Sequence, residues 1–285
     1  MIDLHFHSTC SDGSDTPELL AEKCAALELY AAALTDHDTL AGTAQFVAAC
    51  EARGVRAMTG VELSAETHLG SLHILGYGVD PQHHDLNDAL RLCRAGRDGR
   101  NEIMVRKLRE LGADITLEEI AAEAGGEIVA RPHFARVLLA KGFVSTYYEA
   151  FDNYLAKGKP AYADRFRLDP SEAVRLIHAA GGVAVLAHPF DYAVSFERLD
   201  EKLAGLAADG LDGIEVYYTG YDGERLVDAL RLARRHKLLA TGGSDYHGFA
   251  NPGVFIGRGS GRLAVPDACF DALASRIAPG KIPPP

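Results

Sequence analysis

Short apolar runs alternate with amphipathic stretches along most of the chain. The runs that predict strands lie at residues 1–4, 31–35, 55–61, 72–79, 182–187, 213–218 and 238–241. The stretches with apolar residues at helical spacing begin near residues 16, 40, 171, 199 and 224. This alternation predicts an α/β fold with a parallel sheet and right-handed crossovers.

The pattern changes from about Leu86, where the sequence becomes charged and helical with little strand signal. Helical stretches continue through Arg109 and recur at 117–123, 131–141 and 147–155. We therefore predict a barrel made of residues 1–99 and 166–285, with a mainly helical insertion at 100–165 that acts as a substrate cap. The Pro-rich end, residues 282–285, is expected to be disordered.

Composition narrows the class of protein. Hydrophobic residues make up 47% and charged residues 24%, as in ordinary globular proteins. The five cysteines have no C-x-x-C spacing, and the chain has neither a membrane-length apolar run nor a signal peptide, which predicts a cytoplasmic protein without a membrane partner. A net charge of −11 argues against binding long nucleic acid, but not against a small phosphorylated ligand in a positive pocket.

Metal-ligating residue types follow the predicted strands. His5 and His7, at period two, share one face of the first strand, and Asp12 lies in the turn that follows. Most of the candidate ligands lie where catalytic groups of α/β barrels sit, at carboxyl ends of strands. The nine candidates are His5, His7, Asp12, His37, Glu62, His73, His188, Asp245 and His247.

Imidazole with carboxylate and no thiolate suits Mn²⁺, Zn²⁺ or Fe²⁺. Nine ligands are too many for one ion and about right for two or three, with Glu62 as the natural bridge. Three divalent ions beside three carboxylates would leave a positive site that attracts phosphate monoesters and activates water.

The candidate ligands lie in a set of short sequence motifs: His5-x-His7, Asp12, Thr35-Asp36-His37-Asp38, Gly60-Val61-Glu62, His73, Ala187-His188-Pro189 and Ser244-Asp245-x-His247. Together they resemble the motif set of the PHP (polymerase and histidinol phosphatase) family. The resemblance implies a distorted (β/α)7 barrel with three divalent ions, Mn²⁺ being the first expectation and Zn²⁺ or Fe²⁺ the alternatives. It also implies three ligand sets: His5, His7, Glu62 and Asp245; Glu62, His73 and His188; and Asp12, His37 and His247.

The predicted insertion carries candidate substrate-binding residues. Arg131, His133 and Arg136 lie at the start of a predicted helix, where free N–H groups also favour anions. Arg100 and Asn101 lie where the insertion begins. A second anion-binding patch beside a hydrolytic site suggests a substrate with two phosphates.

These insertion motifs resemble the PHP branch of 3′,5′-nucleoside bisphosphate phosphatases, some of which are also 5′→3′ exoribonucleases on short RNA. The implied reaction removes the 3′-phosphate of a nucleotide such as adenosine 3′,5′-bisphosphate by attack of a metal-bound hydroxide, leaving a nucleoside 5′-monophosphate. His133 is the candidate catalytic residue that holds the phosphate or protonates the leaving oxygen.

Three other functions remain open: an exoribonuclease acting on 5′-phosphorylated RNA, a histidinol-phosphate phosphatase, and a non-catalytic module of a polymerase. Base stacking is expected from an aromatic residue, the candidates being Phe134, Phe190, Tyr192 and Tyr218. Asp36 and Asp38 are expected to orient neighbouring imidazoles. Glu215 is interpreted either as a support for the ligands or as a polar core residue.

Overall fold

The computed structural model describes residues 1–67, 70–125, 128–192 and 195–277. The Pro-rich end that we expect to be disordered lies outside these ranges. The strands are β1 (Ile2–Asp3), β2 (Ala31–Leu34), β3 (Arg56–Thr67), β4 (Gly70–Tyr77), β5 (Val183–Leu186), β6 (Gly213–Tyr218) and β7 (Leu239–Gly243). The α-helices are α1 (Pro17–Ala26), α2 (Thr43–Glu51), α3 (His84–Glu110), α4 (Leu117–Ala124), α5 (Arg131–Ala140), α6 (Tyr147–Ala150), α7 (Pro170–Ala179), α8 (Phe196–Ala208), α9 (Gly223–His236) and α10 (Asp267–Ala274). Shorter helical segments are η1 (Phe151–Leu155), η2 (Pro189–Tyr192) and η3 (Gly248–Ala250).

The helices begin where their capping residues predict. Thr16 accepts a hydrogen bond from the N–H of Leu19, and Pro17 occupies the first turn of α1. Thr116 and Glu119 form a reciprocal capping box at the start of α4. Replacing such a cap by Ala costs about 1 kcal/mol of stability. These local signals explain why the helix positions follow from the sequence.

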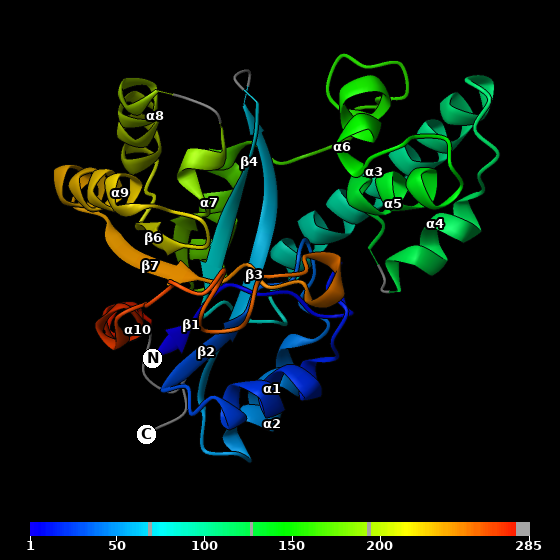
Figure 1. Cartoon of the computed structure of the whole chain (residues 1–285). Coiled ribbons are helices and arrows are strands. Elements are labelled where there is room, and N and C mark those ends of the chain that lie inside the picture. Colours follow the sequence, from blue (N-terminus) through cyan, green and yellow to red (C-terminus); the bar gives the residue numbers. More distant parts are fainter. Residues whose placement is uncertain (68–69, 126–127, 193–194, 278–285) are drawn as a thin grey trace.

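The seven strands form one sheet in chain order, β1 to β7. The sheet nearly closes into a barrel, because the N–H of Leu4 donates to the carbonyl of Gly242 and Phe6 pairs with Tyr246. The predicted seven-stranded α/β barrel with a helical segment is thereby confirmed (Figure 1).

The expectation of a wholly parallel sheet is wrong at one strand. β4 runs antiparallel to both β3 and β5, whereas the other neighbouring pairs are parallel. Only two residues separate Thr67 from Gly70, too few for the dozen or so that a parallel crossover requires. β3 also runs six residues past the predicted strand end at Val61, because these residues pair with β4. The reversal of β4 brings its start to the end of the barrel where β5 finishes.

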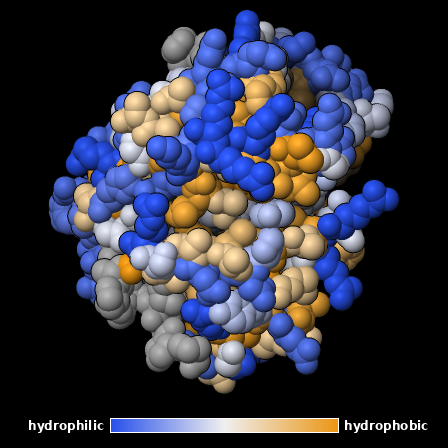
Figure 2. Space-filling model, turned by 90° about the vertical axis from the view of Figure 1, so that its left-hand side faces the viewer, coloured by the Kyte–Doolittle hydropathy of each residue, from blue (hydrophilic) through white to orange (hydrophobic). Residues whose placement is uncertain are grey.

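Apolar clusters hold the helices against the barrel. α1 and α2 pack on one side of β2, while α7, α8 and α9 cover β3 to β6. The helix α10, which the sequence pattern did not predict, adds Cys269, Phe270 and Leu273 to the cluster that fills the barrel. Figure 2 shows the face formed largely by α8, α9 and α10, where hydrophobic residues lie interspersed among hydrophilic ones. No helix within the described ranges is long and apolar enough to span a bilayer.

The helical segment has an apolar cluster of its own. α4, α5 and α6 stand to one side of the barrel with the later part of α3 (Figure 1). Leu86 and Leu90 at the start of α3 belong to a barrel cluster, whereas Met104 and Leu108 belong to the helical cluster. The predicted boundary at residues 99 and 100 therefore falls inside one continuous 27-residue helix. A separate substrate cap stays a prediction.

Candidate metal and substrate site

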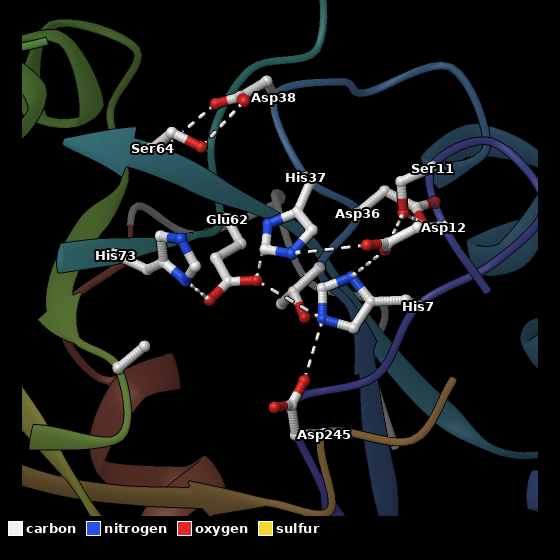
Figure 3. Close-up of polar contacts among 12 residues, drawn as sticks. His7, Ser11, Asp12, Asp36, His37, Asp38, Glu62, Ser64, His73 and Asp245 are labelled. Carbon is white, nitrogen blue, oxygen red and sulfur yellow. Dashed lines mark hydrogen bonds and ion pairs between the residues drawn. The ribbon is translucent and has the colours of Figure 1, made fainter. Parts of the chain in front are cut away.

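The nine candidate ligands gather at one end of the barrel. His5 and His7 follow β1, His37 follows β2, and Glu62 lies within β3 beside His37. His188 follows β5, while Asp245 and His247 follow β7. Figure 3 shows residues of these separate elements pointing toward one another.

His73 joins the group because β4 is antiparallel. It lies near the start of its strand, opposite Ser64 of β3, and its carbonyl accepts the N–H of Ala187. In a parallel strand the same position would lie toward the opposite end of the barrel.

Glu62 lies at the centre of the cluster. Its Oε2 lies within 3.5 Å of three ring nitrogens, those of His5, His7 and His37. Its Oε1 lies within 3.2 Å of two others, those of His73 and His188. The two oxygens of one carboxylate thus face two different sets of imidazoles, as a bridging ligand requires.

Two further groups flank Glu62. Asp245 Oδ1 lies 3.1 Å from His7 Nε2 and 3.4 Å from His5 Nε2. Asp12 Oδ1 lies 3.4 Å from His247 Nε2, and its Oδ2 lies 3.9 Å from His37 Nε2. The candidate ligands form three groups, and within each group the ligand atoms lie within 4.8 Å of one another: His7, Asp12, His37 and His247; His5, His7 and Asp245; and His37, Glu62 and His73. The first group shares His7 with the second and His37 with the third.

Several buried atoms of this cluster lack a hydrogen-bond partner in the part of the chain that the structure describes, and together they fit divalent cations. Among the described residues, His5 Nε2, His7 Nδ1, His37 Nδ1 and Glu62 Oε2 are buried without a hydrogen-bond partner. Buried polar atoms in proteins are almost always satisfied, and a bound cation would satisfy these. The buried clusters of His, Asp and Glu fit several metal sites, and the donor set does not choose one metal.

Burial also favours the protonation state that binds metal. It lowers the pKa of His7 to about 3 and that of His73 to about 4, so both rings are neutral at pH 7. Burial acts the same way on His247, but Asp12 and Asp245 outweigh it and raise the pKa of that ring to about 10. A cation at His247 would therefore displace a proton.

Glu215 supports the ligands from behind. This fully buried carboxylate lies 3.0 Å from His5 Nδ1 and accepts the backbone N–H of His188 at 2.8 Å. The contact leaves His5 Nε2 facing Glu62, the arrangement by which carboxylates orient metal-bound histidines. Of the two interpretations of Glu215, its contacts favour the supporting one.

Asp36 and Asp38 accept hydrogen bonds from serine backbone and hydroxyl groups. Asp36 accepts hydrogen bonds from the N–H and hydroxyl of Ser8 at 2.7 and 2.6 Å, and Asp38 accepts two from Ser64, both at 2.8 Å. These hydrogen bonds of both carboxylates fix neighbouring strands and loops, and they do not support the expectation that Asp36 and Asp38 orient imidazoles, which stays a prediction.

The backbone is strained where it presents the ligands. Asp38, His188 and Asp245 have φ values of 51°, 26° and 54°, in the left-handed region that non-glycine residues rarely adopt. Each follows a strand end, and such strain persists only where the surroundings enforce it. Nearby Gly243 admits no side chain, since a Cβ there would lie 2.4 Å from His5.

Comparison with known proteins identifies the family. The model of the PHP domain matches residues 3–157. The chain belongs to the PHP domain family. The 3′,5′-nucleoside bisphosphate phosphatase of Chromobacterium violaceum is 35% identical over 264 residues, 90% of each chain. The 5′-3′ exoribonuclease of Haemophilus influenzae is 35% identical over 245 residues, 86% of this chain and 89% of the relative.

A solved structure agrees over nearly the whole length. An amidohydrolase from Chromobacterium violaceum with bound SO4 and no metal superposes with a TM-score of 0.87 at 34% identity, covering 97% of each chain. With the relatives and the buried ligand clusters, this makes the chain a PHP phosphoesterase, a hydrolase with metal-binding residues.

Beside the ligands of this PHP protein lies a group of basic residues that we call the arginine cluster: Arg97, Arg100, Arg131, Arg165 and Arg167. Arg97 donates two hydrogen bonds to Asp38 Oδ2, at 3.0 and 2.9 Å. Both Arg97 and Arg165 donate to Ser64 Oγ at 2.9 Å. Asp38 directly follows His37, and Ser64 pairs with His73, so the residues that hold the arginine cluster are direct neighbours of two candidate metal ligands.

The arginine cluster carries uncompensated positive charge. Its five guanidiniums face three carboxylates, those of Asp38, Glu66 and Asp164. Burial, followed by repulsion from neighbouring arginines, lowers the pKa of Arg100. Among the described residues, Arg165 Nε and Nη1 are buried without a hydrogen-bond partner. A bound anion would offset the excess positive charge and accept hydrogen bonds from the unsatisfied donors of Arg165.

The predicted substrate residues divide between two places. Arg100 and Arg131 lie in the arginine cluster, where Asn101 accepts two hydrogen bonds from Arg100 and donates one to the carbonyl of Val129. His133 and Arg136 instead line a cavity of about 620 Å³, and Arg136 pairs with Glu123 at 2.6 Å. Their binding roles stay predictions.

The cavity extends from the candidate metal ligands to the helical segment. Its barrel side includes Asp12, His247, Phe249, Asn251 and Pro252, and its helical side includes Pro132, His133, Arg136, Tyr147 and Tyr148. His133 Nδ1 accepts the N–H of Ala130 at 2.9 Å, which leaves Nε2 to carry the proton of the neutral ring.

Several of these residues were not predicted from the sequence. Arg165 and Arg167 lie in the run Asp164-Arg165-Phe166-Arg167, where two arginines at period two were the available signal. Phe249 lies two residues after His247 of the Asp245-x-His247 motif. Of the predicted stacking residues, Phe134 is fully buried in the helical cluster and cannot stack on a ligand. The phenols of Tyr192 and Tyr218 instead bond to Ala187 and Asp245 within the site.

Proposed function

We propose that this PHP phosphoesterase removes the 3′-phosphate from nucleoside 3′,5′-bisphosphates, such as adenosine 3′,5′-bisphosphate, to give a nucleoside 5′-monophosphate and phosphate. The observation that carries the proposal is the arginine cluster beside the metal ligands. A metal site would bind the phosphate that is cleaved, and the neighbouring arginine cluster would bind a second phosphate. The named activity of the relative from Chromobacterium violaceum supports the same substrate class.

The nine His, Asp and Glu residues would hold two or three divalent ions, bridged by Glu62. Such ions, Mn²⁺ being our first choice, supply Lewis-acid polarisation of phosphoryl oxygens and lower the pKa of bound water. Glu215 and Tyr218 keep His5 and Asp245 in the orientation that binding needs.

In this proposal the chain's other residues bind and orient the substrate. Arg165, with Arg100 and Arg131, holds the phosphate that is not cleaved. His133 lies close enough to Asp12 for that charge to affect its pKa, which burial lowers to about 4. A neutral ring with its proton on Nε2 donates a hydrogen bond to a phosphate oxygen or to the leaving ribose oxygen.

A 5′→3′ exoribonuclease activity on short 5′-phosphorylated RNA is the second candidate. The relative from Haemophilus influenzae has this name at equal identity. An arginine cluster that holds a terminal 5′-phosphate would serve either reaction. A histidinol-phosphate phosphatase has less support, because its substrate has one phosphate and would leave the arginine cluster without a partner.

The test is a substrate panel. Mn²⁺-loaded protein is given adenosine 3′,5′-bisphosphate, adenosine 5′-monophosphate, histidinol phosphate and a short 5′-phosphorylated RNA, and phosphate and nucleotide products are quantified. We expect the bisphosphate to give adenosine 5′-monophosphate with the highest kcat/KM. A preference for histidinol phosphate would overturn the proposal, and full activity after chelation would overturn the role of metal.

A further inference from the structure

Two exposed aromatic side chains stand at the cavity that reaches the metal ligands. Phe249 is 82% exposed and Tyr148 is 76% exposed, more than any other large hydrophobic residue among those described. Both line the same cavity as Asp12 and His247. Phe249 comes from the barrel side and Tyr148 from α6 on the helical side, so the two rings approach the cavity from different parts of the fold.

The backbone that carries Phe249 is fixed, although its ring is free. The N–H of Phe249 donates to Ser14 Oγ at 3.0 Å, and the N–H of Ser14 donates to the carbonyl of His247 at 3.2 Å. Gly248 has a φ of 67°, and a Cβ there would lie 1.8 Å from Ser14 Oγ. These contacts place Phe249 two residues from a metal ligand while leaving its ring in solvent.

The backbone that carries Tyr148 is fixed from its own side of the cavity. Thr146 caps the short helix α6 by accepting the N–H of Glu149 at 3.1 Å. The neighbouring ring of Tyr147 packs 5.4 Å from that of Phe151, centroid to centroid. Tyr148 lies edge-on to Tyr147 at 5.7 Å, which leaves most of its own surface exposed.

A planar heteroaromatic ligand is the partner that these rings fit. Exposed aromatic rings next to a binding site are typical of recognition surfaces, and each stacked nucleobase contributes about 1–3 kcal/mol. A phosphate at Asp12 and His247 would bring the attached ribose and base of a nucleotide into this cavity. Stacking recognises any base, because every base has a π-face.

We propose that Tyr148 and Phe249 stack on the base of the nucleotide substrate and make the protein select nucleotides over sugar phosphates without selecting one base. This proposal rests on the proposed function for the choice of a nucleotide. Of the aromatic residues that the sequence suggested for this role, Phe134 is fully buried.

A fluorescent nucleotide tests the proposal by binding rather than turnover. The chain has no tryptophan, so 1,N6-ethenoadenosine 5′-monophosphate can be excited without interfering protein fluorescence. Titrations use the full chain loaded with Zn²⁺. We expect quenching on binding to the wild type and a Kd that rises on the order of 10-fold in Phe249→Ala and in Tyr148→Ala. Tyr148→Phe, which keeps the ring, should bind like the wild type.

Two controls separate stacking from structural damage. Phe255→Ala removes a ring that is 60% exposed but does not line this cavity, and it should leave the Kd unchanged. Ribose 5-phosphate, which has no base, should bind equally to the wild type and to every variant in calorimetric titrations.

The outcomes keep this inference distinct from the proposed function. The stacking role would be overturned by an unchanged nucleotide Kd in Phe249→Ala and Tyr148→Ala, or by no nucleotide binding to the wild type. It would also be overturned if these variants lost ribose 5-phosphate binding to the same extent as nucleotide binding. If binding depends on the rings while adenosine 3′,5′-bisphosphate is not hydrolysed, the stacking role stands and the bisphosphatase proposal fails.

Discussion

The barrel end and the helical segment of this protein both carry predicted site residues but organise them differently. At the barrel end, side chains from six strands or their adjoining loops converge around one carboxylate, Glu62. In the helical segment, Arg131 and Arg136 lie on the same helix, yet Arg131 joins the arginine cluster whereas Arg136 pairs with Glu123 beside the cavity.

The difference comes from what fixes each side chain. Strand pairing sets the position of a residue at a strand end to within one register step, so a motif there specifies a place in space. On a helix, residues five positions apart point in directions that differ by about 140°, and packing decides what each one meets. The candidate metal ligands are therefore one interdependent unit, whereas the candidate substrate residues are separable.

The largest effect should come from breaking the interdependent unit at its centre. Glu62→Gln removes the charge that five imidazoles share, and we expect metal retention and phosphate release both to fall by at least about 100-fold. Metal-to-protein ratio after dialysis and initial rates measure the two effects. Glu172→Gln, in a surface ion pair with Arg175, is the control and should change neither. Retention of full metal content by Glu62→Gln would contradict the bridging role.

The next effect concerns the support behind the ligands. Glu215→Gln keeps the size of the side chain but replaces one carboxylate oxygen with a donor, so it cannot face both His5 Nδ1 and the His188 N–H as an acceptor. We expect metal affinity to fall about 10- to 100-fold, as for other outer carboxylates of metal-bound histidines. Calorimetric metal titration measures the loss, and an unchanged far-UV circular dichroism spectrum shows that the fold persists. An unchanged affinity would return Glu215 to the polar-core interpretation.

A smaller effect should separate the two arginines of α5. Arg131→Met removes a charge from the arginine cluster, and a charge-assisted hydrogen bond is worth about 1.5–3 kcal/mol, so KM for adenosine 3′,5′-bisphosphate should rise about 10-fold or more. Adenosine 3′-monophosphate has no 5′-phosphate, and its KM should stay constant.

Arg136→Met is the matched comparison for that prediction. Its guanidinium is paired with Glu123 and lies outside the arginine cluster, so any effect should be the same for the two nucleotides. If Arg131→Met raised KM equally for both, the second phosphate would not bind at the arginine cluster.

The same contrast explains how far the sequence could predict this molecule. The barrel, its ligand-bearing strand ends and the helical segment follow from short buried runs and capping residues such as Thr16 and Thr116. The reversal of β4 did not follow, because alternating apolar residues specify a strand and not its direction. The arginine cluster could not be predicted from the sequence either. Arg97 and Arg165 are 68 positions apart in the chain, and the fold brings them together at Ser64 and Asp38, two residues that no local sequence pattern links to either arginine.

The smallest predicted effect concerns His133 and is a matter of protonation. Burial lowers its pKa to about 4, below the ordinary value of 6.5, so the ring is neutral across the pH range in which the enzyme would work. A general acid near neutral pH needs its pKa raised toward 7 instead. We therefore expect a neutral hydrogen-bond donor, and since one such bond contributes about 0.5–1.5 kcal/mol, His133→Asn should lower kcat about 5-fold.

The pH profile of kcat decides between donor and acid. If His133 donates a hydrogen bond from a neutral ring, the profile of His133→Asn from pH 5 to 9 keeps the shape of the wild-type profile at a lower height. If His133 delivers a proton, the variant loses the alkaline limb that its deprotonation would cause in the wild type. Because Ala130 donates to Nδ1, a proton gained by the ring at neutral pH would have to break that 2.9 Å bond. Loss of the alkaline limb would thus show that substrate binding reorganises the start of α5.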